Sequence, residues 1–178
     1  MQFAKDSFFV ALSERLGLLN PQRTVSIGGS TRPAVVVTEN EMPTAALAPE
    51  RVFMISWGPA KMCKDFTTSA VSLIELECSI SYGTSGSSED GMDRGRLLTT
   101  LDSELLQICT PPFTEKRDYT GADHAPRGGN IFWTAPEIEN RKVTTGGQSI
   151  SRNIMTKTPL YRIATLSVFF YPEVVSND

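Results

Sequence analysis

The chain has 178 residues, a net charge of −3, and an ordinary balance of 40% apolar and 21% charged residues. A chain of this length can bury about 70% of its unfolded surface in one core, so we expect a single domain over residues 1–178. The small negative charge gives no global attraction to nucleic acid or to an anionic membrane. No sequence-specific nucleic-acid binding is therefore expected.

Three cysteines, Cys63, Cys78 and Cys109, are an odd number without CxxC spacing, which argues against a disulfide framework or a zinc site. We expect them to be small apolar core groups in a reducing compartment. Charged residues such as Lys5 and Asp6 interrupt the N-terminal apolar pattern, which is unlike a signal peptide. No run reaches the roughly 20 apolar residues of a membrane-spanning helix. The sequence thus predicts a protein that is soluble and intracellular at synthesis.

The first third of the chain predicts one helix followed by two strands. Residues 3–19 repeat large apolar side chains at helical spacing, and Asn20-Pro21 supplies a stop. The expected apolar stripe is Phe8, Leu12, Leu16 and Leu19. Residues 34–38 and 51–57 are β-branched or apolar and predict two strands, with 39–50 as a connector.

The clearest strand signal covers residues 71–82, where apolar and polar side chains alternate strictly. Such alternation predicts one face on the core and the other against water or a polar partner. The core-facing set is Ile74, Leu76, Cys78, Ile80 and Tyr82, and the opposite set is Glu75, Glu77, Ser79 and Ser81. Residues 83–91 (GTSGSSEDG) predict a flexible turn, and 92–109 predict a helix. The stripe of that helix is Leu97, Leu98, Leu101, Leu105 and Ile108.

Residues 110–158 have almost no helical or strand periodicity and predict a long irregular arm or insertion. Loops beyond about 12–15 residues are uncommon in compact domains and usually have a function. The arm also contains large apolar groups, including Phe132 and Trp133, so we expect part of it to be buried against another chain. Residues 160–171 are apolar on both faces for much of their length and predict a central strand. The expected fold is α+β, with a mixed or antiparallel sheet packed by two helices in the order α-β-β-β-α-arm-β.

Charge is distributed unevenly along the chain. One connector is acidic, through Glu39, Glu41 and Glu50. A later run has five basic residues and no acid: Arg141, Lys142, Arg152, Lys157 and Arg162. Segregation of this kind suits contact between copies of one protein, although solvated loops would look the same. These groups are candidate subunit-interface residues. Phe132 and Trp133 join them, with Trp133 equally suited to an intramolecular anchor.

The sequence contains only weak signals of catalytic chemistry. Three Gly-Gly pairs (28–29, 128–129 and 146–147) predict flexible or left-handed turns and not a phosphate loop. His124 is the one histidine, and with Ser85 and Asp123 it could form a hydrolase set, but the sequence around Ser85 is not a nucleophile elbow. Glu89, Asp90 and Asp93 are better explained by capping a helix and compensating its dipole than by a metal. No catalytic residue, metal or cofactor is expected.

Residues 71–108, VSLIELECSISYGTSGSSEDGMDRGRLLTTLDSELLQI, carry a resemblance to a known family. A solvent-alternating strand leads through a polar loop into a helix that begins near Asp93-Arg94. With the N-terminal helix and the last strand, this order of elements resembles the tail terminator (tail completion) proteins of long-tailed bacteriophages. The resemblance covers residues 1–109 and the final strand, and residues 110–158 depart from its smallest members.

The resemblance implies a virion protein of the tail or neck that assembles in the host cytoplasm. Its partners would be copies of itself in a ring, usually of six, the tail-tube protein and a head–tail connector or neck protein. The ring would stop tube growth, present a surface to the head, and leave a lumen through which DNA could pass. The alternatives are another head–tail joining or tail-tube protein, a small hydrolase using Ser85 and His124, or a host module that accepts a strand at a sheet edge.

Overall fold

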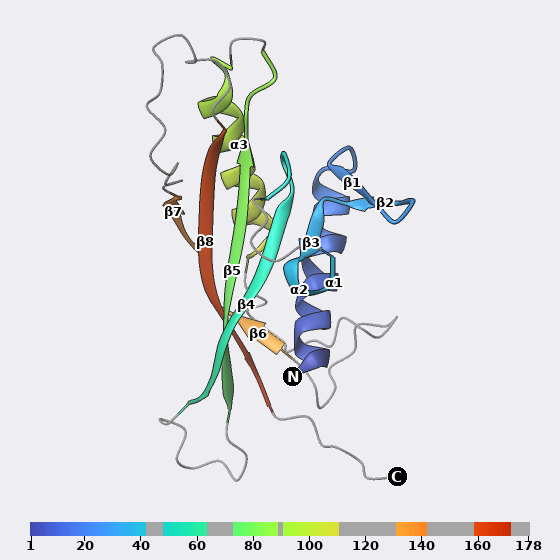
Figure 1. Cartoon of the computed structure of the whole chain (residues 1–178). Helices are drawn as coiled ribbons and strands as arrows, with labels where there is room; N and C mark the ends of the chain where they lie inside the picture. The colour runs from blue at the N-terminus through green and yellow to red at the C-terminus, as the bar shows by residue number, and fades with distance from the viewer. Residues whose placement is uncertain (42–47, 64–72, 89–90, 111–130, 142–158, 172–178) are drawn as a thin grey trace.

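The structure is a computed structural model, and it describes residues 1–41, 48–63, 73–88, 91–110, 131–141 and 159–171. The elements in chain order are α1 (Gln2–Leu19), β1 (Thr24–Ile27), β2 (Ser30–Pro33), β3 (Val35–Val37), α2 (Thr38–Glu41), β4 (Phe53–Met62), β5 (Ile74–Thr84), α3 (Arg94–Ile108), β6 (Ile131–Trp133), β7 (Glu137–Asn140) and β8 (Leu160–Phe170). The described residues form an α+β fold with a mixed sheet, as expected (Figure 1).

Three long strands, β4, β5 and β8, form the centre of a six-stranded sheet with the order β3-β4-β5-β8-β6. The strand β7 also pairs with β8, beyond the end of β6. The β3–β4 pair is parallel and the other pairs are antiparallel. The prediction that the last strand is central is confirmed, because β8 has β5 on one edge and β6 and β7 on the other. Its apolar composition reflects this placement.

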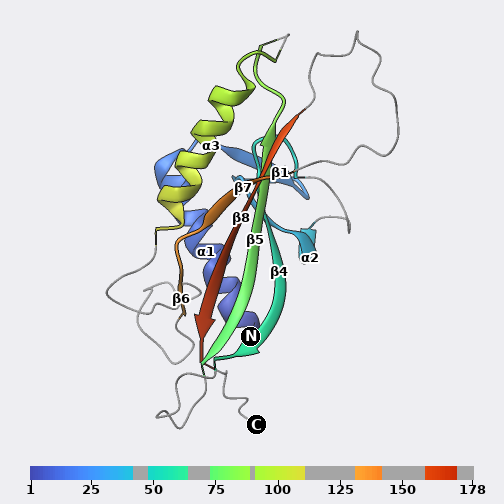
Figure 2. The ribbon, with the colours of Figure 1, turned by 90° about the vertical axis from the view of Figure 1, so that its left-hand side faces the viewer.

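Both long helices, α1 and α3, pack on one face of the sheet (Figures 1 and 2). The predicted alternation of β5 is confirmed over its middle: Leu76, Cys78, Ile80 and Tyr82 are buried under the helices, whereas Glu77 is exposed. It fails at the ends, where Ile74 is half-buried and Ser81, expected on the opposite side, is buried. The α1 stripe is also largely as expected, except that Leu19 is 41% exposed. It lies at the last position of α1, where the helix extends past the sheet-facing residues. Two of the cysteines, Cys78 and Cys109, are buried free thiols, and burial raises the pKa of Cys109 to about 12.

The hairpin of β1 and β2 was not predicted by the sequence pattern. Its strands are four residues each: β1 alternates between exposed and half-buried side chains over too short a length to stand out, and β2 does not alternate. The turn is Gly28-Gly29, with φ values of 58° and 84°, as the sequence predicts for a left-handed turn. Two positive φ angles are what a two-residue hairpin turn with the right twist requires.

The prediction of an irregular arm over residues 110–158 is wrong for its middle part. Residues 131–133 and 137–140 are the strands β6 and β7, which pair with β8. These strands are short, and their partner lies about thirty residues further along the chain, so local periodicity could not reveal them. The rest of the predicted arm, 111–130 and 142–158, lies outside the described residues.

Within the described residues, no helix has both the length and the apolar character needed to cross a bilayer.

Candidate functional site

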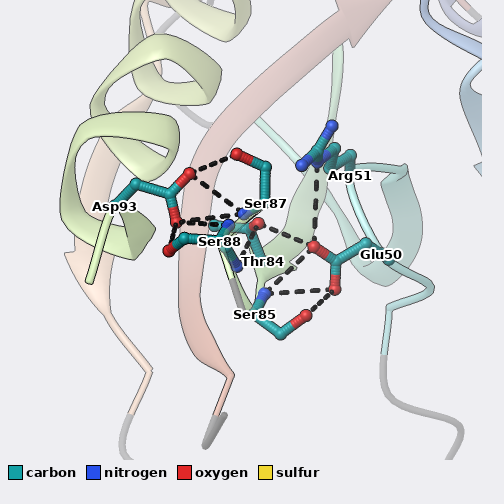
Figure 3. A network of polar contacts seen from close by, with 8 residues as sticks. Glu50, Arg51, Thr84, Ser85, Ser87, Ser88 and Asp93 are labelled. Atoms are coloured by element: carbon teal, nitrogen blue, oxygen red, sulfur yellow. Dashed lines mark hydrogen bonds and ion pairs between the residues drawn. The ribbon is translucent and has the colours of Figure 1, made fainter. Parts of the chain in front are cut away.

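A network of polar contacts joins the end of β5 to the start of α3 and to the residues before β4 (Figure 3). At its centre on one side is Glu50, whose carboxylate accepts hydrogen bonds from the Thr84 hydroxyl at 2.7 Å and the Ser85 hydroxyl at 2.8 Å. The Ser85 amide donates to both oxygens, at 3.0 and 3.1 Å. Partial burial opposes ionisation of Glu50. The hydrogen bonds from Thr84 and Ser85, with the Arg51 guanidinium nearby, outweigh it and lower the pKa of this carboxyl.

Asp93 holds the other side of the same loop. Its carboxylate accepts hydrogen bonds from the amides and hydroxyls of Ser87 and Ser88. The hydrogen bond from the Ser87 hydroxyl is the largest of the effects that hold the pKa of Asp93 far below its usual value. Asp93 is the N-cap residue of α3, but its side chain makes no capping hydrogen bond with the helix. The expected capping role is therefore wrong in detail, because the carboxylate is used by the loop.

These contacts give a folded arrangement to the described part of the turn that the sequence predicts over residues 83–91. Through residue 88, amides and hydroxyls of the loop donate to one of two fixed carboxylates. Gly86, with φ 93°, and Gly91, with φ 66°, supply the left-handed backbone that the folded loop requires. A composition rich in glycine and serine indicated mobility, whereas these residues allow a closely folded loop around acidic groups. Glu89 and Asp90 lie outside the described residues.

Ser85 was the candidate nucleophile of the hydrolase alternative. Its hydroxyl donates to Glu50 Oε2 at 2.8 Å. A carboxylate with a lowered pKa is a weak general base at neutral pH, so this contact positions the loop better than it activates an oxygen. The proposed partners Asp123 and His124 lie outside the described residues.

The two candidate interface aromatics, Phe132 and Trp133, lie on opposite faces of the sheet because side chains alternate along β6. Trp133 is 3% exposed and donates from Nε1 to the Cys109 carbonyl at 3.0 Å. It also packs edge-on against Phe8 of α1, with ring centroids 5.2 Å apart. Of the two roles open for Trp133, the structure thus shows the intramolecular anchor. Phe132 points to the opposite face and stacks on Phe169 at 5.0 Å, half-buried and accessible in part to a partner.

The acidic candidates are also in use within the chain. Glu39 forms an ion pair with Lys5 at 3.1 Å, beside a small cavity of about 140 Å³ between α1 and β4. The Lys5 ammonium also lies 5.7 Å from the centre of the Trp57 ring. Glu50 accepts hydrogen bonds in the loop described above. The side chain of Glu41 lies outside the described part of the chain.

Of the basic candidates, Arg141 follows β7 and is exposed, with its amide bonded to the Tyr161 carbonyl at 3.1 Å. Lys142, Arg152 and Lys157 fall outside the described residues. Arg162, in β8, lies on the helix-covered face, with Nε 3.5 Å from Asp102 of α3. Asp102 also accepts a 2.7 Å hydrogen bond from Tyr82, and burial raises the pKa of that phenol. These contacts join α3 to the sheet, so Arg162 does not belong to a solvent-exposed run.

The sheet face opposite the helices carries a group of acids that only the structure brings together. Register places Glu137 opposite Thr165 and Glu139 opposite Ile163, on the same face as Glu75 and Glu77. The alternation in residues 71–82 predicts the two β5 glutamates there. The β7 pair was missed, although the pattern Glu-Ile-Glu-Asn at 137–140 is a weak signal of a half-exposed strand.

Among the described residues, no group of three or more histidine, cysteine or acidic side chains could hold a metal ion. Comparison with known proteins finds no family model that matches and no curated protein with significant similarity.

Proposed function

We propose that this protein is a tail terminator of a long-tailed bacteriophage: a subunit of a ring, of six copies by analogy, that caps the tail tube. The ring would end tube polymerisation and provide the joining surface to the head or neck. It would act in the virion after assembly in the host cytoplasm.

The observation that carries the proposal is the unit formed by β5, the polar loop and α3. These elements follow one another in the order on which the resemblance rests, and described loop residues within 84–88 donate hydrogen bonds to Glu50 and Asp93. A ring requires two different complementary surfaces on each subunit, since its contacts are heterologous. Helices cover one face of this sheet, and the other face has an acidic region that no described element covers, which gives the subunit chemically different sides.

End-capping needs no bond chemistry. One side of the ring would match the surface that the last tube ring offers to its next neighbour, and the other side would differ from a tube subunit. A further tube subunit would then find no complementary surface, and growth would stop. Capping of this kind depends only on the shape and charge of the subunit surfaces. It requires no reactive side chain, and the loop carboxylates of Glu50 and Asp93 accept hydrogen bonds from their own chain.

The proposal is tested by adding the purified protein to growing tail tubes of a long-tailed phage. Electron microscopy should show ring-shaped particles of the protein alone and extra density at one end of each tube. Tube length should stop increasing once the protein is added, whereas tubes in buffer alone should continue to grow. A protein that remains monomeric at high concentration, and leaves tube ends bare and growing, would refute the proposal.

A further inference from the structure

The face of the sheet opposite the helices, which no described element covers, has a definite chemical character. Side chains that share this face include Glu75 and Glu77 from β5 and Glu137 and Glu139 from β7, by the register of each strand with β8. Glu77, Glu137 and Glu139 are exposed. We call these four residues the acidic face.

A trough of about 520 Å³ runs along this face between β4, β5, β8 and the residues that link β6 to β7. The described residues that line it include three carboxylates, Glu75, Glu77 and Glu137, and one ammonium, Lys61. Lys61 Nζ lies 3.6 Å from Glu75, which also accepts a 2.7 Å hydrogen bond from Ser167. Glu77 and Glu137 remain as exposed negative charges, so the trough attracts cations.

The border of the trough suits arginine in particular. Register places Phe169 next to Glu75, and Phe132 stacks on Phe169 with their rings 13° from parallel. A guanidinium group can lie flat on an aromatic ring and donate two hydrogen bonds to a carboxylate at the same time. This pairing of rings and carboxylates is the chemistry that recognises a basic segment of protein.

We propose that the acidic face docks the basic run of a second copy of this chain. The run supplies Arg141, Lys142, Arg152 and Lys157, and the sequence between Arg141 and Arg162 contains no acid to offset them. The contact deepens the proposed ring, but as an association between two copies it stands independently of tail capping. It also replaces Glu39 and Glu50 as the acidic partners of the run, since both are paired within their own chain.

Contact between copies is the arrangement that a ring requires, since each subunit must offer two different complementary surfaces. The acidic face lies on β5 and β7, which both pair with β8, and is rich in carboxylates. The basic run begins at Arg141, whose amide is bonded to the Tyr161 carbonyl, and its sequence has the opposite charge. The two surfaces are therefore different and complementary in charge.

The test uses two charge-reversed full-length variants and sedimentation analysis of their self-association. The face variant is Glu77→Lys with Glu137→Lys, and the run variant is Arg152→Glu with Lys157→Glu. Each alone should raise the dissociation constant of self-association by roughly tenfold or more, since like charges then meet. An equimolar mixture should restore association, because the basic face of one variant then meets the acidic run of the other.

A matched control is Glu14→Lys with Glu39→Lys, which reverses two exposed acids of α1 and α2. It changes the net charge by the same amount and in the same direction as the face variant. It should associate as the wild type does. Circular dichroism melting of each variant checks that the fold is kept. Raising salt from 0.1 to 1 M shortens the screening length from about 10 to about 3 Å and should weaken wild-type association.

Several outcomes would overturn the inference: a monomeric wild type, a face variant that associates normally, a control that fails equally, or a mixture that stays dissociated. The tube-end assay separates this inference from the proposed function. Copies that associate through the acidic face but leave tube ends bare would contradict tail capping alone. Face-variant protein that still forms rings and caps tubes would contradict the docking alone.

Discussion

Glu50 and Asp93 show how acidic residues in a polar loop can be structural. Each carboxylate accepts hydrogen bonds from amides and hydroxyls that neighbour one another in sequence, so one ionised group fixes several loop residues. Hydrogen bonds to an ionised group are shorter and stronger than those between neutral groups. Both pKa values are lowered by these contacts, Glu50 against the opposing effect of its own partial burial.

Replacing Glu50 with glutamine should loosen this loop and lower stability in a pH-dependent way. The amide keeps one acceptor oxygen and adds a donor where Ser85 and Thr84 already donate. We expect the free energy of unfolding to fall by about 1 kcal/mol at neutral pH, the scale of one net hydrogen bond, because the site is partly exposed. Urea unfolding of Glu50→Gln and wild type measures the difference.

The pH dependence follows from the sign of the pKa shift. Glu50 has a lower pKa in the folded state than its ordinary value of 4.5, so its contribution is present above pH 4.5 and is lost as pH falls through the folded value. The difference between wild type and Glu50→Gln should shrink accordingly in acid. The control Glu39→Gln removes one exposed ion pair and should cost at most about 0.5 kcal/mol. Equal effects of both variants at every pH would contradict the role given to Glu50.

Trp133 shows why an aromatic residue in an unpatterned segment is hard to assign from sequence. Composition alone marks a large side chain that needs burial, and it does not say against which surface. The answer depends on the Cys109 carbonyl, 24 residues earlier, and on Phe8 of α1. Neither contact has a local signature in the sequence, so the sequence is compatible with both roles and only the sheet pairing distinguishes them.

At the level of elements, sequence reasoning succeeded where periodicity is local. The helices α1 and α3 and the strands β5 and β8 each carry a long repeat of 3.6 or 2 residues or a long apolar run, and each was predicted to within about three residues of its ends. The short strands β1, β2, β6 and β7 depend on partners for their structure and were missed. Half of the acidic face was missed with them, because Glu137 and Glu139 join Glu75 and Glu77 only through β8.

The close approach of β5 and β8 depends on Gly83. A Cβ atom built there would lie 2.6 Å from the Leu160 carbonyl oxygen and 2.4 Å from the Tyr161 ring, and the backbone contact cannot be relieved by rotating a side chain. Gly83→Ala should therefore force the strand ends apart and lower the free energy of unfolding by about 1–3 kcal/mol, as for overpacked sites. Thermal and urea unfolding measure this loss.

Gly95 in α3 is the matched control for that substitution. A Cβ atom there meets nothing within 4 Å, and alanine is the better helix former. Gly95→Ala should leave stability unchanged or raise it by up to about 1 kcal/mol. If Gly83→Ala were as well tolerated as Gly95→Ala, the proposed tight contact between β5 and β8 would be wrong.

The described part of the molecule is a sheet with two chemically different faces. On one side, the helices cover the apolar face, and Asp102 of α3 joins the sheet through Tyr82 and Arg162. Glu104 of α3 also pairs with Arg23, the residue before β1, with charged atoms 2.5 Å apart. On the other, the acidic face is uncovered by any described element. Stability is thus concentrated on the helix side, which leaves the acidic face able to change in charge without unfolding the domain.

That separation allows the basic run to be removed while the sheet is kept. Asn140 pairs with Arg162, and the Arg141 amide with the Tyr161 carbonyl, so the residues that flank 142–158 are already side by side. Replacing 142–158 with Asn-Gly leaves a short hairpin loop of a common kind. Deleting all of 111–157 would be less informative, because it would also remove β6, β7 and the buried Trp133.

We expect the shortened protein to keep a melting temperature within a few degrees of wild type, since the pairing of β7 with β8 that flanks the replaced segment is kept and shortening a loop changes its closure entropy only slowly. Its self-association should weaken at least tenfold by sedimentation, because three of the four basic groups that meet the acidic face are gone. A full-length variant with Lys142→Ser, Arg152→Ser and Lys157→Ser separates charge from loop length and should weaken association to a similar degree. If the shortened protein failed to fold, the serine variant alone would decide the matter. Undiminished association of the serine variant would show that the basic run does not join the copies.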